Sequence, residues 1–153
     1  PEEISQVLDV NLKGSVLGSK YALPVMKSQG SGSIIHISSV LGLVGDPDLA
    51  VYGSTKGGLI ALSKSMAVAY GPYGIRVNCI CPGDVNTPMV KEYFDHQPNP
   101  EAARTEVNNH YPLRRIAEPS EVANAIAFLA SDEASFISGT QLLVDGGLSA
   151  EVY

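Results

Sequence analysis

Cysteine is scarce in this chain of 153 residues, which has only Cys79 and Cys81, two positions apart. In an extended segment both side chains would point to one face of a sheet, too close along the chain for a relaxed disulfide. A zinc site would need two further ligands, and the three histidines His36, His96 and His110 are scattered. We therefore expect two buried free thiols, which suits a reducing cytoplasm.

Long apolar runs and an excess of positive charge are also missing. No apolar stretch approaches the roughly 20 residues needed to cross a bilayer. The acidic start, PEEISQVLDV, lacks the basic and then apolar pattern of a secretory signal. The formal net charge is −6 and the sequence pI is about 4.9, which argues against a nucleic-acid-binding surface. We expect a cytoplasmic protein whose partners include neither membrane nor nucleic acid.

What the chain does have is an alternation of helical and extended segments. Apolar residues recur at threes and fours over 1–29, and a second helix is predicted over 52–70. A third, amphipathic helix is predicted from EPSEVANAIAFLAS, with Ser120 as its N-cap. Short apolar runs predict three buried strands: SIIHIS (33–38), IRVNCIC (75–81) and QLLVDGG (141–147). This alternation predicts an α/β fold with a doubly wound parallel sheet built by right-handed crossovers.

The segment 87–118 differs from the rest of the chain. It is polar and contains Pro88, Pro98, Pro100 and Pro112. Helical fragments are compatible with this composition, but the segment is more typical of a mobile flap than of a core. We treat residues 1–153 as a single domain that carries this flap.

The predicted sheet is incomplete. Three strands are few for a doubly wound sheet, and a parallel sheet normally has both edges covered. If the strands lie in chain order, SIIHIS presents an unpaired apolar edge. We expect further strands, on another chain or on a part of the protein outside these 153 residues.

Tyr52 and Lys56 form the pair with the most distinctive chemistry. On a helix they share a face one turn apart. A free tyrosine, with a pKa of about 10, is a poor base at neutral pH, but a nearby ammonium favours the phenolate. Ser39 follows the first predicted strand and could meet Tyr52 at the carboxyl edge of the sheet, where open α/β folds bind ligands. Taken alone, such a pair is more often a packed ring and a solvated lysine stem.

The surroundings of this pair resemble the short-chain dehydrogenase/reductase family. YGSTK matches the family signature Y-x-x-x-K, and Ser39 stands at the usual interval before the tyrosine. DVNLKG resembles the element N-x-x-G, and IRVNCICPGDVNTPM resembles the segment R-V-N-x-x-x-P-G-x-x-x-T. The stretch from PLRR to LLVDGG is similar to the C-terminal part of the family. The resemblance spans about residues 11–147 and implies a Rossmann-like fold.

The resemblance implies a catalytic set. Tyr52 would be the general acid/base, and Ser39 would hold the substrate oxygen. Lys56 would bind the nicotinamide ribose and lower the pKa of the tyrosine. Asn11 would position a water linked to the lysine, although a surface amide is the alternative from its position alone.

The resemblance also implies NAD or NADP as cofactor. Tyr52 and Lys56 would contact it, and Pro82, Gly83, Val85 and Thr87 would line its nicotinamide side. For Thr87, a role as helix N-cap is an alternative compatible with this one. The flap would close over the substrate and exclude water.

The sequence departs from the family in three places. Arg114 stands where relatives often have glycine, and His36 stands where asparagine is common. The family's T-G-x-x-x-G-x-G loop, which binds the pyrophosphate at a helix N-terminus, does not occur. We expect the catalytic C-terminal half of the fold without the dinucleotide-binding N-terminal half, so the choice between NAD and NADP cannot be predicted.

Two functions are compatible with these features. The first is an NAD(P)-dependent oxidoreductase that interconverts a secondary alcohol and a ketone, such as a small polyol, a sugar or a cyclic ketone. The second is a truncated, non-catalytic relative that serves as an assembly module. In either case the family suggests a homotetramer or homodimer formed through the helices 1–29 and 52–70.

Overall fold

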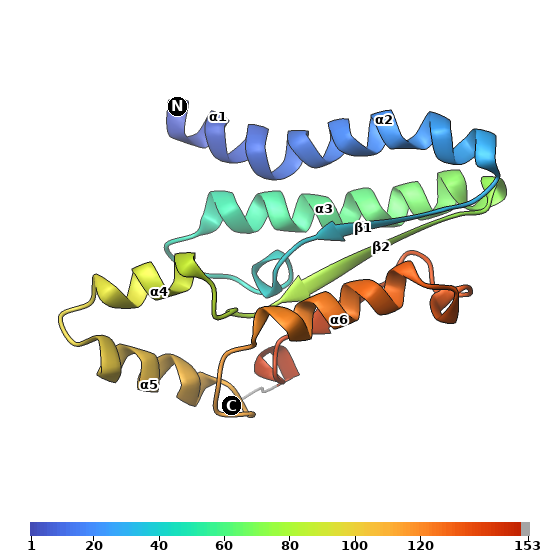
Figure 1. The fold of residues 1–153 in the computed structure, drawn as a ribbon. Helices are drawn as coiled ribbons and strands as arrows, with labels where there is room; N and C mark the ends of the chain where they lie inside the picture. Colours follow the sequence, from blue (N-terminus) through green and yellow to red (C-terminus); the bar gives the residue numbers. More distant parts are fainter. Residues whose placement is uncertain (151–153) are drawn as a thin grey trace.

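Three parallel strands lie between two layers of helices in the computed structural model, which describes residues 1–150 (Figure 1). The last three residues of the predicted domain 1–153 lie outside the described residues. The strands β1 (Gly32–Ile37), β2 (Ile75–Pro82) and β3 (Gln141–Val144) are paired in the order β1-β2-β3. The α-helices are α1 (Glu2–Leu8), α2 (Gly14–Gln29), α3 (Ala50–Tyr70), α4 (Pro88–Asp95), α5 (Pro100–His110) and α6 (Pro119–Ala130). The predicted α/β class and parallel sheet are confirmed.

The structure contains short helical turns that the sequence did not predict. A π-helical turn, η1, separates α1 from α2, and four 3-10 turns connect other elements. These turns are η1 (Asp9–Lys13), η2 (Val40–Gly42), η3 (Gly71–Tyr73), η4 (Asp132–Ala134) and η5 (Leu148–Ala150). The predicted helix 1–29 is therefore interrupted, because apolar spacing alone does not distinguish a π turn from an α turn.

Two helix boundaries also differ from the prediction. The helix predicted over 52–70 begins two residues earlier, at Ala50. The N-cap of α6 is Glu118 rather than Ser120. Glu118 and Glu121 form a reciprocal capping box, and Pro119 occupies the first helical position, where its missing N–H costs nothing. The carboxylate at 118 therefore takes the capping role predicted for the serine.

Helices cover both faces of the sheet. On one face Leu23 of α2 and Met66 of α3 pack against Ile75 and Val77 of β2. On the other face Leu129 of α6 packs with Ile80, which lies three positions after Val77 in β2. Because alternate residues of β2 point to opposite faces, this one strand contributes to both cores and is buried along almost its whole length.

The RVN part of the motif has a structural role. The Arg76 guanidinium donates to carbonyls at the end of α6, with Leu129 O at 2.8 Å and Ser131 O at 3.0 Å. These carbonyls have no partner within the helix, so the arginine acts as a C-cap. Buried Asn78 donates to Ile137 O at 2.8 Å and accepts from Thr140 N at 3.1 Å. The two side chains fasten the second crossover to the sheet.

The segment 87–118 contains α4 and α5 and has a hydrophobic cluster of its own. Phe94, Tyr111 and Ile116 are buried in it. The segment is thus more ordered internally than its polar composition indicated. Its closure over a substrate stays a prediction.

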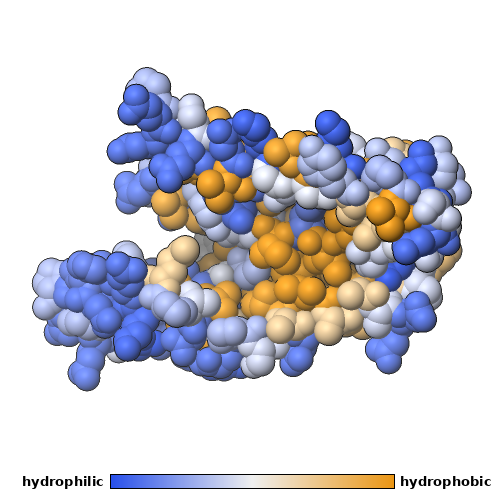
Figure 2. All heavy atoms as spheres, turned by 45° about the horizontal axis from the view of Figure 1, so that its top comes forward, coloured by the Kyte–Doolittle hydropathy of each residue, from blue (hydrophilic) through white to orange (hydrophobic). Residues whose placement is uncertain are grey.

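Apolar side chains remain exposed along α1, α2 and the free edge of β1. Among the described residues β1 pairs only with β2, as expected from the sequence. Figure 2 shows apolar surface gathered in a hollow near the middle of one face of the molecule. None of the helices within residues 1–150 is long and apolar enough to span a membrane. The exposed apolar residues of α1, η1, α2 and β1 are Ile4, Leu8, Val10, Val16, Leu17, Tyr21, Val25 and Ile37.

Candidate active site

Ser39, Tyr52 and Lys56 lie together at the carboxyl end of β1. Ser39 follows β1 and is the N-cap of η2, where its hydroxyl oxygen accepts from Leu41 N at 3.2 Å. Tyr52 and Lys56 stand on successive turns at the start of α3, with the Lys56 Nζ 5.3 Å from the centre of the tyrosine ring. The loop between β1 and α3 is what brings the serine to the other two residues.

Two glycines, Gly42 and Gly53, allow the backbone of this loop to pack directly against the backbone of α3. A Cβ atom at Gly53 would lie 2.9 Å from Leu41 O, and one at Gly42 would lie 2.9 Å from the Lys56 carbonyl carbon. Ser38 adds a direct tie, because its hydroxyl donates to Lys56 O at 2.7 Å. Its amide donates to Ile80 O at 2.8 Å. The serine, the helix and the sheet are therefore held in one rigid arrangement.

The Lys56 ammonium reaches back to the end of the strand. Its Nζ donates to Ile37 O at 3.0 Å. Burial lowers the pKa of Lys56, and the neighbouring Cys79 opposes this shift. The backbone carbonyl thus fixes the position of the ammonium beside the phenol.

The pKa of Tyr52 differs from the sequence expectation. Burial raises it above its ordinary value, hydrogen bonding with the Ser39 hydroxyl lowers it, and the charge of Asp84 raises it again. The net direction is upward, whereas the sequence predicted a pKa lowered by Lys56. The reason is that the ring is half-buried and that the negative charge of Asp84 adds to the effect of burial.

Asn11 occupies the π-helical turn η1. This turn packs against α3, where a Cβ at Gly58 would lie 3.2 Å from the Leu12 side chain. The Ser15 hydroxyl donates to Asn11 O at 3.1 Å. Within residues 1–150 the Asn11 side chain forms no hydrogen bond with Lys56. π turns are frequent at functional sites, so the predicted role of Asn11 stays a prediction.

The four residues predicted to line the cofactor follow one another at the end of β2. Pro82 ends the strand and is buried, and Gly83 donates to Val144 O at 3.1 Å. Val85 forms a bridge with Ala117. Thr87 is the N-cap of α4, as the sequence predicted, but its hydroxyl makes no capping hydrogen bond. Because strands β1 and β2 are parallel, these residues share an edge of the sheet with Ser39.

This edge fits the nicotinamide end of a dinucleotide. The Lys56 ammonium and the Tyr52 hydroxyl are donors for a ribose, Val85 is an apolar neighbour for a ring, and the Thr87 hydroxyl is available as a donor or acceptor. The described residues contain no glycine-rich loop that would receive a pyrophosphate. The groups at this edge would therefore hold only the nicotinamide end of a dinucleotide.

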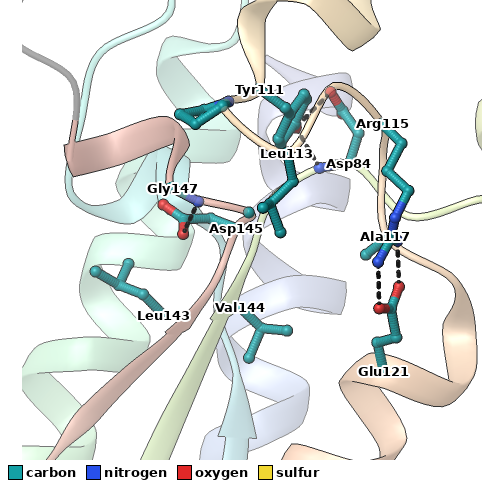
Figure 3. A pocket seen from close by; sticks show the side chains of 12 residues that line it. Asp84, Tyr111, Leu113, Arg115, Ala117, Glu121, Leu143, Val144, Asp145 and Gly147 are labelled. Atoms are coloured by element: carbon teal, nitrogen blue, oxygen red, sulfur yellow. Dashed lines mark hydrogen bonds and ion pairs between the residues drawn. The ribbon is translucent and has the colours of Figure 1, made fainter.

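Three residues that matter at this edge were missed or undervalued from the sequence. Ser38 holds Lys56, Asp84 influences the pKa of Tyr52, and Tyr111 contacts Asp84. Asp84 and Tyr111 lie at a cavity of about 500 Å³ between the 111–117 stretch and the end of β3 (Figure 3). No spacing rule connects Tyr111 with a turn 27 residues earlier, so a single sequence carries no signal for this contact.

His36 is a buried core residue. Its two ring nitrogens lie 2.9 Å from the Ser19 hydroxyl and 2.8 Å from the Ser63 hydroxyl, which joins α2, β1 and α3. Burial lowers the pKa of His36. Cys79 and Cys81 lie on the same face of the sheet and are free and buried, which confirms the prediction.

The family model described as "Enoyl-(Acyl carrier protein) reductase" matches residues 1–149. The chain is 46% identical over 144 residues to the oxidoreductase UcpA of Salmonella typhimurium. It is 43% identical to cis-4-hydroxycyclohexanecarboxylate dehydrogenase of Sinomonas cyclohexanicum and 43% identical to L-fucose dehydrogenase of Bos taurus. These alignments cover 92% to 96% of this chain but 54% to 56% of the relatives.

Solved structures agree in fold. The aldohexose dehydrogenase of Thermoplasma acidophilum superposes with a TM-score of 0.93 at 40% identity, covering 99% of this chain and 61% of that one. A gluconate 5-dehydrogenase of Burkholderia cenocepacia in complex with NADP and tartrate gives 0.92 at 31% identity, covering 99% and 58%. The chain thus spans little more than half the length of the proteins that it matches.

Proposed function

Because this chain belongs to the short-chain dehydrogenase/reductase family, we propose that the protein containing it is an NAD(P)-dependent oxidoreductase that interconverts a secondary alcohol and a ketone. The observation that carries this proposal is the convergence of Ser39, Tyr52 and Lys56 beside the end of β2. A structural role alone does not require an ammonium held beside a half-buried phenol.

The proposed reaction assigns one task to each side chain. Tyr52, Lys56 and the residues at the end of β2 would hold the nicotinamide, which would supply the hydride acceptor for alcohol oxidation and the hydride donor for ketone reduction. In the oxidation direction the Tyr52 phenolate takes the hydroxyl proton of the alcohol, and in the reduction direction the phenol donates it. The Ser39 hydroxyl donates a hydrogen bond to the substrate oxygen, where negative charge develops. Lys56 stabilises the phenolate electrostatically and donates to the ribose.

The raised pKa of Tyr52 has a consequence for the direction of catalysis. A phenol that keeps its proton at neutral pH is ready to act as an acid, which suits ketone reduction. A phenolate, which alcohol oxidation requires, forms only at higher pH. We therefore infer that oxidation rises with pH until Tyr52 is deprotonated.

We propose a hydroxylated or cyclic substrate. The relatives include dehydrogenases named for L-fucose, aldohexose and cis-4-hydroxycyclohexanecarboxylate. The Asp84 carboxylate at the edge of the site could accept hydrogen bonds from a second hydroxyl of such a compound. The alcohol or ketone would be the small-molecule partner of the protein. We propose a cytoplasmic location, with which two buried free thiols are compatible.

The test is a panel of aldoses, polyols and cyclic secondary alcohols incubated with the protein and with either NAD or NADP. The appearance of reduced nicotinamide is followed by its near-ultraviolet absorbance. Saturable turnover of at least one member supports the proposal, and Ser39→Ala should reduce it by about 10-fold to 100-fold. A protein that binds reduced nicotinamide with no turnover of any member would contradict the proposed substrate class.

A second candidate is a non-catalytic assembly module. It is favoured by the apolar residues exposed along α1 and α2, which could pack against another copy in a homodimer or homotetramer. Helix α3 could contribute to the same interface. A titration with NADH and NADPH separates the candidates, because a pure assembly module should show no saturable binding.

A further inference from the structure

Tyr111 packs against the turn that follows β2. It is the C-cap of α5, and its side chain is 2% exposed. A Cβ atom at Gly83 would lie 2.8 Å from the Tyr111 hydroxyl oxygen and 2.9 Å from its Cε1. The ring therefore lies directly on the glycine backbone, and any larger residue at 83 would displace it.

The Tyr111 hydroxyl uses both of its hydrogen-bonding capacities on the next residue. It donates to Asp84 Oδ2 at 2.8 Å and accepts from Asp84 N at 2.7 Å (Figure 3). One side chain thus holds the main chain and the side chain of Asp84 together. Burial raises the pKa of Tyr111, which keeps the hydroxyl protonated and able to donate.

Residues 111–117 also contact the turn after β2 through backbone hydrogen bonds. Ala117 N donates to Asp84 O at 3.0 Å, and Asn86 N donates to Ala117 O at 2.8 Å. The stretch itself is tied to the end of β3, because Leu113 N donates to Gly146 O at 3.3 Å. The turn after β2 is therefore fixed by residues 111–117, which connect α5 to α6, and a displacement of the α4–α5 segment would be transmitted to it.

We propose that Tyr111 is a positioning residue that fixes the Gly83–Asp84 turn, and thereby couples the placement of the α4–α5 segment to cofactor binding beside Tyr52. This inference rests on the proposed function, because the turn is assigned to the nicotinamide side of the site. Tyr111 acts through Gly83 and Asp84 and need not touch the cofactor itself. The hydroxyl is the essential part, since the ring alone cannot orient the Asp84 amide.

The main test is Tyr111→Phe in the full-length protein. This variant keeps the ring on Gly83 and removes both hydrogen bonds. The KM for the cofactor should rise about fivefold to 10-fold, while kcat at saturating cofactor stays within about twofold of the wild-type value. Hydrogen–deuterium exchange of a peptide covering residues 80–88 should become faster. Tyr73→Phe is the matched control, because this partly exposed hydroxyl in η3 makes no hydrogen bond among the described side chains.

A second variant keeps the test decisive if Tyr111→Phe fails to fold. Asp84→Ala leaves the Tyr111 ring and its bond to the amide in place, and should raise the cofactor KM by about threefold. The double variant should be no worse than Tyr111→Phe alone, because both substitutions break one arrangement. Additive effects would contradict the proposal.

The failure of this inference can be distinguished from failure of the proposed function. Wild-type cofactor KM and wild-type exchange in Tyr111→Phe would overturn the positioning role even in an active enzyme. Absence of turnover in the wild-type protein would contradict only the proposed function. In that case faster exchange at 80–88 and weaker binding of NADH by Tyr111→Phe would still support the positioning role.

Discussion

At the scale of single residues, the pKa of Tyr52 depends on burial and neighbouring charge more than on the spacing of Tyr52 from Lys56. The Y-x-x-x-K spacing places the ammonium 5.3 Å from the ring centre, as helix geometry requires. The direction of the pKa shift, however, is set first by burial and is reinforced by Asp84, which lies 32 positions further along the chain. The sequence points to Tyr52 as the proposed acid/base, but it does not show the direction in which the pKa of Tyr52 is shifted.

The influence of Asp84 can be measured directly. Asp84→Asn removes a negative charge that raises the pKa of Tyr52, so this pKa should fall. Alcohol oxidation needs the phenolate, and its rate should therefore reach half of the plateau at a lower pH than in the wild-type enzyme. The measurement is a pH profile of kcat/KM for oxidation. Asp132→Asn, which makes the same charge change in η4, should leave the profile in place, and an unshifted profile in Asp84→Asn would rule out this coupling.

At the scale of elements, the strands and helices with a regular apolar pattern were predicted from the sequence. Local features without such a pattern, such as a π turn, were missed. The three strands were found because each is an apolar run between residues typical of turns, and the structure pairs them in parallel. The π turn at Asp9–Lys13 was missed because its apolar spacing resembles that of a continuous helix. Arg114 shows the limit again. Its φ of 57° lies in the left-handed region that favours glycine, and the sequence could not show that arginine adopts it here.

The contact between η2 and α3 can be tested at one glycine. Gly53→Ala places a methyl group 2.9 Å from Leu41 O, so the loop must move away from the helix and carry Ser39 with it. We expect kcat/KM to fall by about 10-fold or more, with a loss of about 1–3 kcal/mol in the free energy of unfolding.

The control for this substitution is Gly71→Ala at the end of α3. A Cβ there meets no atom within 4 Å, and its backbone is already helical. This control should retain activity and gain about 0.4–1 kcal/mol in stability. Thermal melting and steady-state kinetics of both variants provide the comparison. Equal activities in the two variants would show that the loop tolerates displacement.

At the scale of the whole molecule, the proposed catalytic residues and an unpaired strand lie next to each other. Ser39 lies just beyond the carboxyl end of β1. The side of β1 that does not pair with β2 has no neighbouring strand among residues 1–150. The unpaired edge was predicted from the sequence, because SIIHIS is apolar and three strands are few for a doubly wound sheet. Catalysis by Ser39, Tyr52 and Lys56 stays a prediction. The sequence could not predict how the crossover between β2 and β3 supports the site, because that support depends on Tyr111 and Ala117 contacts across about 30 positions. The matched relatives are longer than this chain, which is consistent with more sheet beside β1.

The central claim is that Tyr52 transfers the proton in an NAD(P)-dependent reaction at this edge. The most direct measurement is the turnover of Tyr52→Phe in the full-length protein, with the Kd for NADH measured on the same preparation. Phenylalanine keeps the ring and removes the hydroxyl, so kcat should fall by about 100-fold to 10,000-fold while the Kd for NADH stays within about threefold. Turnover near the wild-type value in a correctly folded Tyr52→Phe protein would contradict the account.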